Sequence, residues 1–305
     1  MEIWIPTTVF AAFCQNLRSA LQKHLAGDFG PAVATFVRFG FGFPFACLYV
    51  VGLRWMTDSP WPEVTPIFYP AAICGGLAQI AATFLLIKLF SMRNFAVGTA
   101  YSKTEPVQAA LFGFLLLGEK LTAVLLGAIV AGVAGVILIS TGKSSEKAGT
   151  SGQPFGWRNA LRPAAYGLGS AALFGASAAL YRLACLALEG TGFLMQAAIA
   201  LACVTAFQTV VMGSWLAWRR MDQLRATLTH WRLSTLVGLA GVSGSAGWFT
   251  AMTLQQVAYV RALGQVELLF TFAVSLLVFR EKITGRDVLG CSMILASVVV
   301  ISILG

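Results

Sequence analysis

Residues 101–122 read YSKTEPVQAALFGFLLLGEKLT and place a lysine, a glutamate and a proline inside a strongly apolar part of the chain. Of the 305 residues, 58% are hydrophobic and 11% are charged, and the mean hydropathy is +0.79. A soluble domain carries about a quarter charged residues. Apolar runs of about 20 residues, long enough to cross a bilayer as a helix, recur along the chain. The sequence therefore predicts an all-α integral membrane protein.

Windows of about 19 residues predict ten transmembrane helices with short loops. A longer connection, TGKSSEKAGTSGQPFGWRN at residues 141–159, is rich in Gly, Ser and charge, which is typical of a linker. We expect a first five-helix unit at residues 1–141, a linker at 142–162 and a second five-helix unit at 163–305. The expected spans lie near residues 3–22, 31–53, 66–90, 95–117, 121–141, 163–187, 193–218, 233–256, 259–279 and 286–304.

The two units resemble each other in sequence. GEKLT at residues 118–122 is matched by REKIT at 280–284, an offset of 162 residues, and the same offset carries Glu105 onto Glu267. A chain that crosses the membrane five times ends on the opposite side, so the second unit must be inverted relative to the first. Inverted repeats with a site near the membrane midplane are a recurring plan of secondary transporters.

The distribution of loop charge predicts an orientation. Loops after odd-numbered spans carry most of the loop Lys and Arg, so the positive-inside rule places both termini outside. The net charge of +9 fits contact with anionic lipid, and no nucleic-acid-reading motif accompanies it. We expect a multi-pass protein of the cell membrane, in a bacterial inner membrane, and leave open whether it is a monomer or a homodimer.

Glu105 and Glu267 are the most informative residues. If their spans begin near residues 95 and 259, they lie about 15 Å and about 12 Å into the membrane. A carboxylate at that depth costs about 2.5–3.5 kcal/mol on insertion scales, so buried acids face a bundle interior or an aqueous cavity. Lys103 lies beside Glu105 in sequence. Pro106 removes a helical hydrogen bond and predicts a kinked or opened helix at Lys103 and Glu105.

Three interpretations of the acids remain open. They bind a cationic group of a substrate or exchange protons, or they form structural ion pairs with Lys103, or they lie at the membrane interface. The sequence does not say whether Lys103 pairs with Glu105 or with Glu267. Further polar or aromatic candidates for a substrate and proton site have an alternative role as helix-packing groups. They are Gln15, Gln79, Tyr101, Trp248 and Gln265.

The chain offers little for catalysis. The six cysteines are scattered through apolar segments, and two histidines are too few for a metal site. No Gly-x-x-x-x-Gly-Lys-Ser/Thr loop for a nucleotide phosphate is present. We therefore expect no cofactor, no metal and no enzymatic activity.

Residues 96–122, AVGTAYSKTEPVQAALFGFLLLGEKLT, resemble the ten-helix EamA-type branch of the drug/metabolite transporter (DMT) superfamily. That branch has a proline-containing fourth helix followed by a Leu-Gly-Glu turn. The residues around Glu281 resemble the same turn more weakly. Arg38, the arginine that opens span two, also fits the pattern of the branch. The resemblance implies a secondary carrier, often an exporter of metabolites or toxic compounds, with both termini cytoplasmic. That orientation conflicts with the loop charges, and the resemblance assigns no role to Lys103, Glu105 or Glu267.

The sequence therefore supports several hypotheses about function. The leading one is a proton-coupled or exchanging secondary transporter of a small polar metabolite, such as an amino acid, with two lobes that alternate around Glu105, Glu267 and Lys103. A second is an exchanger of anions or phosphate esters that uses Lys103, Arg261 and Arg18. A third is a membrane scaffold without a transport cycle.

Overall fold

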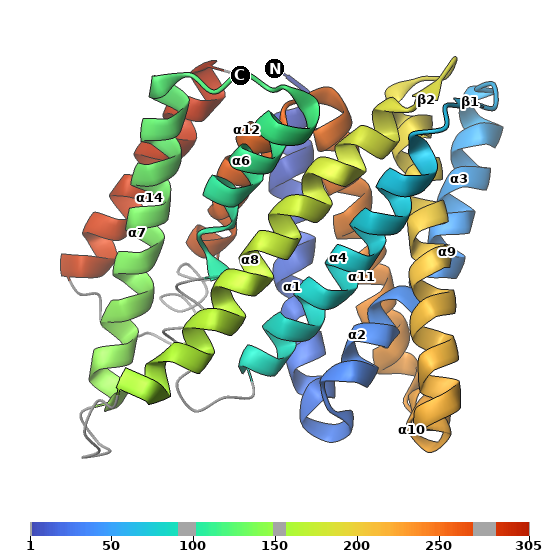
Figure 1. Ribbon diagram of the computed structural model, residues 1–305, viewed down its shortest axis with the longest axis horizontal. Helices are drawn as coiled ribbons and strands as arrows, with labels where there is room; N and C mark the ends of the chain where they lie inside the picture. The colour runs from blue at the N-terminus through green and yellow to red at the C-terminus, as the bar shows by residue number, and fades with distance from the viewer. Residues whose placement is uncertain (1, 91–101, 149–156, 271–284, 305) are drawn as a thin grey trace.

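The computed structural model describes residues 2–90, 102–148, 157–270 and 285–304 as a helical bundle (Figure 1). The first half contains α1 (Trp4–Phe29), α2 (Pro31–Gly40), α3 (Phe43–Thr57), α4 (Phe68–Phe90), α6 (Glu105–Leu117) and α7 (Ala123–Ala148). The second half contains α8 (Trp157–Leu186), α9 (Phe193–Arg219), α10 (Met221–Thr229), α11 (Trp231–Leu254), α12 (Val257–Leu263), the 3₁₀ turn η1 (Gly264–Val266) and α14 (Gly285–Leu304).

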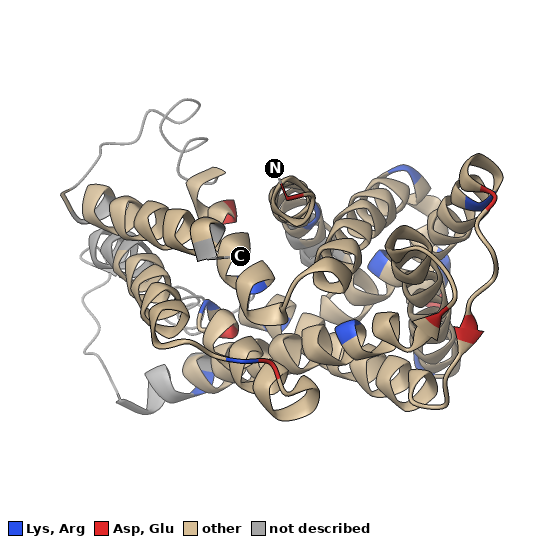
Figure 2. Cartoon of the chain, turned by 90° about the horizontal axis from the view of Figure 1, so that it is seen from above, with Lys and Arg blue, Asp and Glu red and all other residues tan. Residues whose placement is uncertain are grey.

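The outer faces of the helices are apolar. Leu48, Leu115 and Val130 are more than half exposed, and such contiguous apolar surface marks contact with a membrane or a partner. Most of the bundle is uncharged, and several charged positions lie among the helices and not on the rim (Figure 2). Within the described residues, four segments are long and apolar enough to cross a membrane: Pro31–Thr57, Phe68–Leu89, Ala164–Leu186 and Phe193–Arg219.

The expected span at residues 31–53 corresponds to one apolar segment, Pro31–Thr57, which consists of two helices. The chain leaves the helix at Phe41 and Gly42, which separate α2 from α3. A Cβ on Gly42 would lie 2.6 Å from the carbonyl oxygen of Arg38 and 2.8 Å from Cγ2 of Val242, so only glycine fits this joint against α11. The short helix α10 was also not expected, because its polar sequence, MDQLRATLT, gives no hydropathy signal.

The expected spans four and nine are both interrupted immediately before a glutamate. Lys103 and Thr104 form a turn, and α6 begins at Glu105, with Pro106 in the first helical turn. At that position the missing amide hydrogen costs no helical hydrogen bond. In the second half, η1 interrupts the helix and ends immediately before Glu267. The rest of both expected spans, residues 95–101 and 271–279, lies outside the described residues.

Most of the helix packing joins one half of the chain to the other. The largest contacts are α4 with α8, α1 with α11, α7 with α14, α6 with α8 and α3 with α9. The sequence likeness between residues 19–23 and 178–182 pairs α1 with α8, and chain order then pairs α4 with α11. The α1–α11 contact is therefore the counterpart of the α8–α4 contact.

The start of α1 and the end of α14 lie at the same end of the molecule (Figure 1), which we call the terminal end. Two loops join the halves here through a short antiparallel pair of strands, β1 (Glu63–Val64) and β2 (Leu188–Glu189). Next to the strands, the backbone nitrogen and the hydroxyl of Thr65 each donate to the carbonyl oxygen of Ala187 at 3.0 Å.

Candidate functional site

Glu267 pairs with Lys103, which comes from the other half of the chain. Gln15 of α1 donates from Nε2 to Glu267 Oε2 at 3.0 Å, and Asn16 reaches the Glu267 carbonyl oxygen at 3.5 Å. The Lys103 side chain is 25% exposed and that of Glu267 is 13% exposed. This ion pair is therefore only partly shielded by the protein.

Glu105 pairs with Arg261 of α12 instead of with its sequence neighbour Lys103. The distance from Arg261 Nη1 to Glu105 Oε1 is 3.0 Å. The guanidinium carbon of Arg261 lies 4.6 Å from the ring centroid of Trp248 in α11, close enough for a cation–π contact. The Arg261 side chain is 7% exposed and that of Glu105 is 19% exposed, so the cation of this pair is better shielded than Lys103 and the carboxylate is slightly less shielded than Glu267.

The two ion pairs cross between the halves and are linked to each other. Each glutamate lies in one half and its cation in the other. Trp248 donates from Nε1 to Gln15 Oε1 at 3.0 Å, and Gln15 in turn donates to Glu267. A continuous chain of contacts therefore runs from Glu105 through Arg261, Trp248 and Gln15 to Glu267.

A second polar cluster lies between α4, α8 and α9. Gln79 accepts hydrogen bonds at Oε1 from the Tyr181 hydroxyl at 3.0 Å and from Gln208 Nε2 at 2.9 Å. The Tyr181 ring stacks on Phe249 with 4.5 Å between centroids. All four side chains are buried. In an apolar bundle, such amides and hydroxyls are stable when they satisfy one another.

Two arginines lie side by side near these clusters. Arg18 of α1 is 5% exposed and Arg38 of α2 is 4% exposed. A Cβ on Gly241 of α11 would lie 3.3 Å from Arg38 Cγ and 3.6 Å from Arg18 Cδ, so both side chains pass over the same glycine. Arg38 donates to the Thr83 hydroxyl at 3.0 Å, and Arg18 reaches the Ser19 hydroxyl at 3.3 Å.

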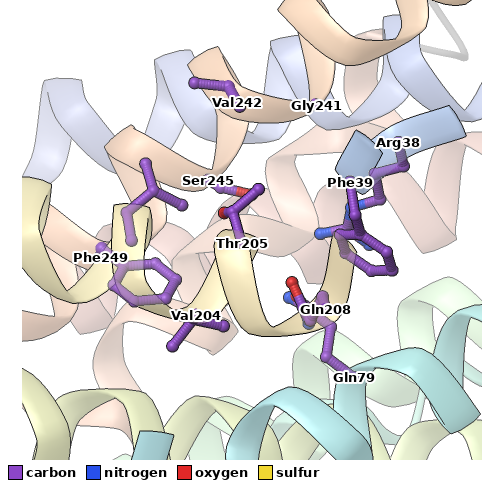
Figure 3. Close-up of a pocket in the computed structure, with 11 residues that line it drawn as sticks. Arg38, Phe39, Gln79, Val204, Thr205, Gln208, Gly241, Val242, Ser245 and Phe249 are labelled. Carbon is purple, nitrogen blue, oxygen red and sulfur yellow. The ribbon is translucent and has the colours of Figure 1, made fainter. Parts of the chain in front are cut away.

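Two small cavities open between these groups, each with room for about one water molecule. Arg38, Gln79, Ser245 and Phe249 line both. Figure 3 shows the first cavity, with Gln208 of α9 opposite Ser245 of α11. Arg261 lines the second, and no carboxylate lines either. The polar groups of the lining are therefore cationic, amide and hydroxyl, and the remaining side chains are aromatic or otherwise apolar.

The structure brings most of the expected site residues together. Lys103, Glu105, Gln15, Trp248 and Glu267 form the linked chain, and Gln79 belongs to the adjacent cluster. Gln265, which is described, is not part of this arrangement.

Gln265 lines neither cavity. A Cβ on Gly132 of α7 would lie 3.5 Å from its Nε2, and its side-chain oxygen and nitrogen have no hydrogen-bond partner among the described residues. Tyr101 lies outside the described residues.

Sequence reasoning missed the role of Gln208 and did not place Arg38 in the site. Gln208 is a lone amide in an otherwise apolar segment, ALACVTAFQTVVM, and that was the available signal. Hydropathy places Arg38 at the start of span two, near the membrane surface. The break between α2 and α3 instead leaves it buried within the bundle.

Glu119, in the GEKLT turn, joins the halves at the terminal end. Its Oε1 lies 2.8 Å from Arg182 Nε of α8, and its carboxylate accepts from the Val257 backbone nitrogen at 3.1 Å. The carboxylate thus also satisfies an amide at the N-terminus of α12. Thr122 of the same turn accepts from the backbone nitrogen of Leu125 at 3.2 Å, which caps the start of α7.

Comparison with known proteins identifies the family. The sequence profile described as "EamA-like transporter family" matches residues 2–141 and again residues 162–303. A solved structure titled "Crystal structure of protein" aligns with a TM-score of 0.68 and 14% identity over 98% of this chain and 99% of that one, which shows a shared fold alone. A search of curated proteins found no significant match.

The apolar helices and the two profile matches describe a multi-pass membrane protein. The matched residues cover nearly the whole chain in two copies. The chain therefore belongs to the EamA-like transporter family, of the drug/metabolite transporter type, whose members are transporters and not enzymes.

Proposed function

We propose that the protein is a secondary transporter of a small polar metabolite, an exporter or exchanger of the cell membrane that works by alternating access. Its lobes would be two inverted five-helix units, residues 1–141 and 163–305, joined by a linker at 142–162. The observation that carries the proposal is the crossed pairing, in which Glu105 binds Arg261 and Glu267 binds Lys103.

The packing pattern supports a two-fold relation between the units. When each helix is replaced by its counterpart in the other unit, the α1–α11 contact becomes the α8–α4 contact and the reverse. The α7–α14 and α3–α9 contacts each join a helix to its own counterpart, so they stay the same. This is what a two-fold axis between the units requires. The helix interruptions before Glu105 and before Glu267 also obey the offset of 162 residues.

The crossed ion pairs would couple movement of the lobes to the binding of a substrate or a proton. Separation of the lobes would leave a buried carboxylate or cation unpaired, which costs several kcal/mol. A proton on the carboxylate or a charged substrate group would offset that cost. Movement is therefore favourable when one of these partners is bound, which is the requirement for coupled transport or exchange.

The terminal end is closed in this conformation. The strands β1 and β2 pair across the halves, and Glu119 contacts both Arg182 and Val257. The internal cavities hold about one water molecule each. A metabolite therefore requires the lobes to separate, and this conformation is interpreted as one that excludes substrate.

Transport by purified protein in liposomes tests the proposal. The liposomes would be loaded with radiolabelled amino acids, organic acids, sugar phosphates or polyamines, and release would be followed with and without an imposed pH gradient. We expect at least one class to be released faster than from protein-free liposomes, and Glu105→Gln and Glu267→Gln to slow that release. Asp222→Asn is the matched control, because Asp222 is an exposed acid in α10.

The outcomes separate the hypotheses. If no compound class moves faster than in protein-free liposomes, the result favours a scaffold without a transport cycle. If transport occurs but both glutamine variants match wild type in rate and in pH dependence, the acids have no role in the cycle. A second candidate function, exchange of anions, is favoured by the two adjacent arginines.

A further inference from the structure

The buried charges of the central region do not balance. Among the described residues of the two linked clusters, the cations are Arg18, Arg38, Lys103 and Arg261, and the carboxylates are Glu105 and Glu267. Each carboxylate already pairs with one cation, Lys103 or Arg261. Two positive charges are therefore left without a carboxylate partner, and they belong to the two arginines over Gly241.

The hydrogen-bond partners of Arg18 and Arg38 within the described residues are neutral, although Glu267 and Glu105 lie close enough to Arg18 to attract its charge. Their contacts are the hydroxyls of Ser19 and Thr83, and Arg18 Nε makes no hydrogen bond within the described part of the chain. Both side chains are at least nine-tenths buried. Two like charges side by side in a low-dielectric interior repel each other, and each bears a desolvation cost. An anion between them would relieve both effects.

Of these two arginines, Arg38 faces the internal cavities, whereas Arg18 lines neither of them. Arg38 lines both internal cavities, and no acid faces it there. Ser245 and Gln79 line the same cavities and supply polar groups from two other helices. Guanidinium groups bind carboxylates and phosphates with two parallel hydrogen bonds. The site therefore has the donors for an oxyanion.

The cavity walls also indicate what the rest of the ligand looks like. Phe249 lines both cavities, and Trp248 and Phe174 line the second. Aromatic faces of this kind cover the apolar or planar body of a ligand, while a few polar groups fix its orientation. In this conformation Phe249 stacks on Tyr181 and Trp248 lies against Arg261, so the apolar body of a ligand would reach these rings after the lobes separate.

We infer that Arg18 and Arg38 form the binding site for the oxyanion group of a small organic acid, a carboxylate or a phosphate ester, whose apolar body lies against Phe249 and Trp248. The inference rests on the proposed transport function and names its substrate class. It assigns Glu105 and Glu267 to the crossed ion pairs that join the lobes and leaves recognition of substrate charge to the arginines.

Thermal unfolding of the detergent-solubilised full chain tests the site without any transport step. The probes would be benzoate and succinate for carboxylates, glucose 6-phosphate for phosphate esters, inorganic phosphate as an ion without a body, and putrescine as a cation. All are compared at equal ionic strength, which holds screening constant. We expect at least one organic anion to raise the melting temperature in a saturable way, and putrescine to leave it unchanged.

Variants of the two arginines test whether the anion binds at Arg18 and Arg38. Arg38→Gln and Arg18→Gln should each weaken the binding of the stabilising anion by roughly 30-fold or more, as expected for loss of a buried charge partner. Arg38→Lys should retain part of the binding, because it keeps the charge but loses the forked geometry. Arg219→Gln is the matched control, because Arg219 is an exposed arginine of α9 that lies over Trp218, and it should bind like wild type.

Several outcomes would overturn the inference, and they differ from those that overturn transport. Stabilisation by putrescine and by no anion contradicts it, as does equal stabilisation of wild type and of a folded Arg38→Gln protein. If no arginine variant folds, the wild-type comparison of anions with putrescine still decides. Anion binding without transport in liposomes would preserve this site and refute the transporter, whereas transport of cations alone would do the opposite.

Discussion

Glu105 and Glu267 occupy equivalent positions in the two halves, yet their surroundings differ. Both follow a helix interruption, and both bind a cation from the opposite half. The partner of Glu105 is an arginine over an aromatic ring, with a side chain 7% exposed. The partner of Glu267 is a lysine whose side chain is 25% exposed.

This difference indicates that the two ion pairs have different tasks. Arginine holds a carboxylate through a planar fork of donors, whereas lysine is a flexible and strongly hydrated point charge. A buried arginine pair costs more to break than a partly hydrated lysine pair. The Glu105–Arg261 pair is therefore suited to hold the lobes, and the Glu267–Lys103 pair is suited to open and close.

The largest expected effect comes from Glu105→Gln, which removes the partner of a buried arginine. We expect a loss of about 3–5 kcal/mol in the free energy of unfolding, measured by denaturation in detergent. The double variant Glu105→Gln, Arg261→Gln should recover much of this loss, because it leaves no unpaired charge. A double variant as unstable as the sum of the single variants would show that the pair is not coupled.

Glu267→Gln should have a smaller effect, about 1–2 kcal/mol, because Lys103 can turn toward water and Gln15 can still hydrogen-bond an amide. The same denaturation measurement compares it with Glu105→Gln. If Glu267→Gln lowers the free energy of unfolding more than Glu105→Gln does, the roles must be reversed: the Glu267–Lys103 pair would hold the lobes and the Glu105–Arg261 pair would open and close.

Trp248→Phe should have the smallest effect, about 1 kcal/mol. The phenyl ring still lies beneath Arg261, but the donor to Gln15 is lost. Because Trp248 links the two ion pairs, we expect the coupling energy between Glu105→Gln and Glu267→Gln in a double-mutant cycle to fall in this background. An unchanged coupling energy would indicate that the pairs communicate by another route.

The sequence predicted the membrane class, the EamA family and the prominence of the two glutamates. Hydropathy was sufficient for the membrane class, the resemblance of residues 96–122 indicated the family, and the repeat at a fixed offset singled out the two glutamates. Neither method resolves a break inside an apolar run. The joint at Phe41 and Gly42 arises from the close approach of α11, a tertiary contact that a window average does not contain.

The sequence likewise could not predict which charged residues form ion pairs between the halves. Lys103 lies two residues from Glu105, so a local interpretation could not choose its partner, and the structure pairs it with a residue 164 positions away. The sequence did not predict that Arg18 and Arg38 are adjacent, because they belong to different helices that meet over Gly241. Residues that act together here are brought together by packing and not by spacing.

The contacts that close the terminal end have a kinetic consequence. The β1–β2 pair and the Glu119 contacts each join a residue of one half to a residue of the other. If the halves move as rigid bodies, all of these contacts must therefore break together. Opening there is then all-or-none and has a large activation enthalpy. Turnover should accordingly rise steeply on warming, and Arg182→Gln should flatten that slope.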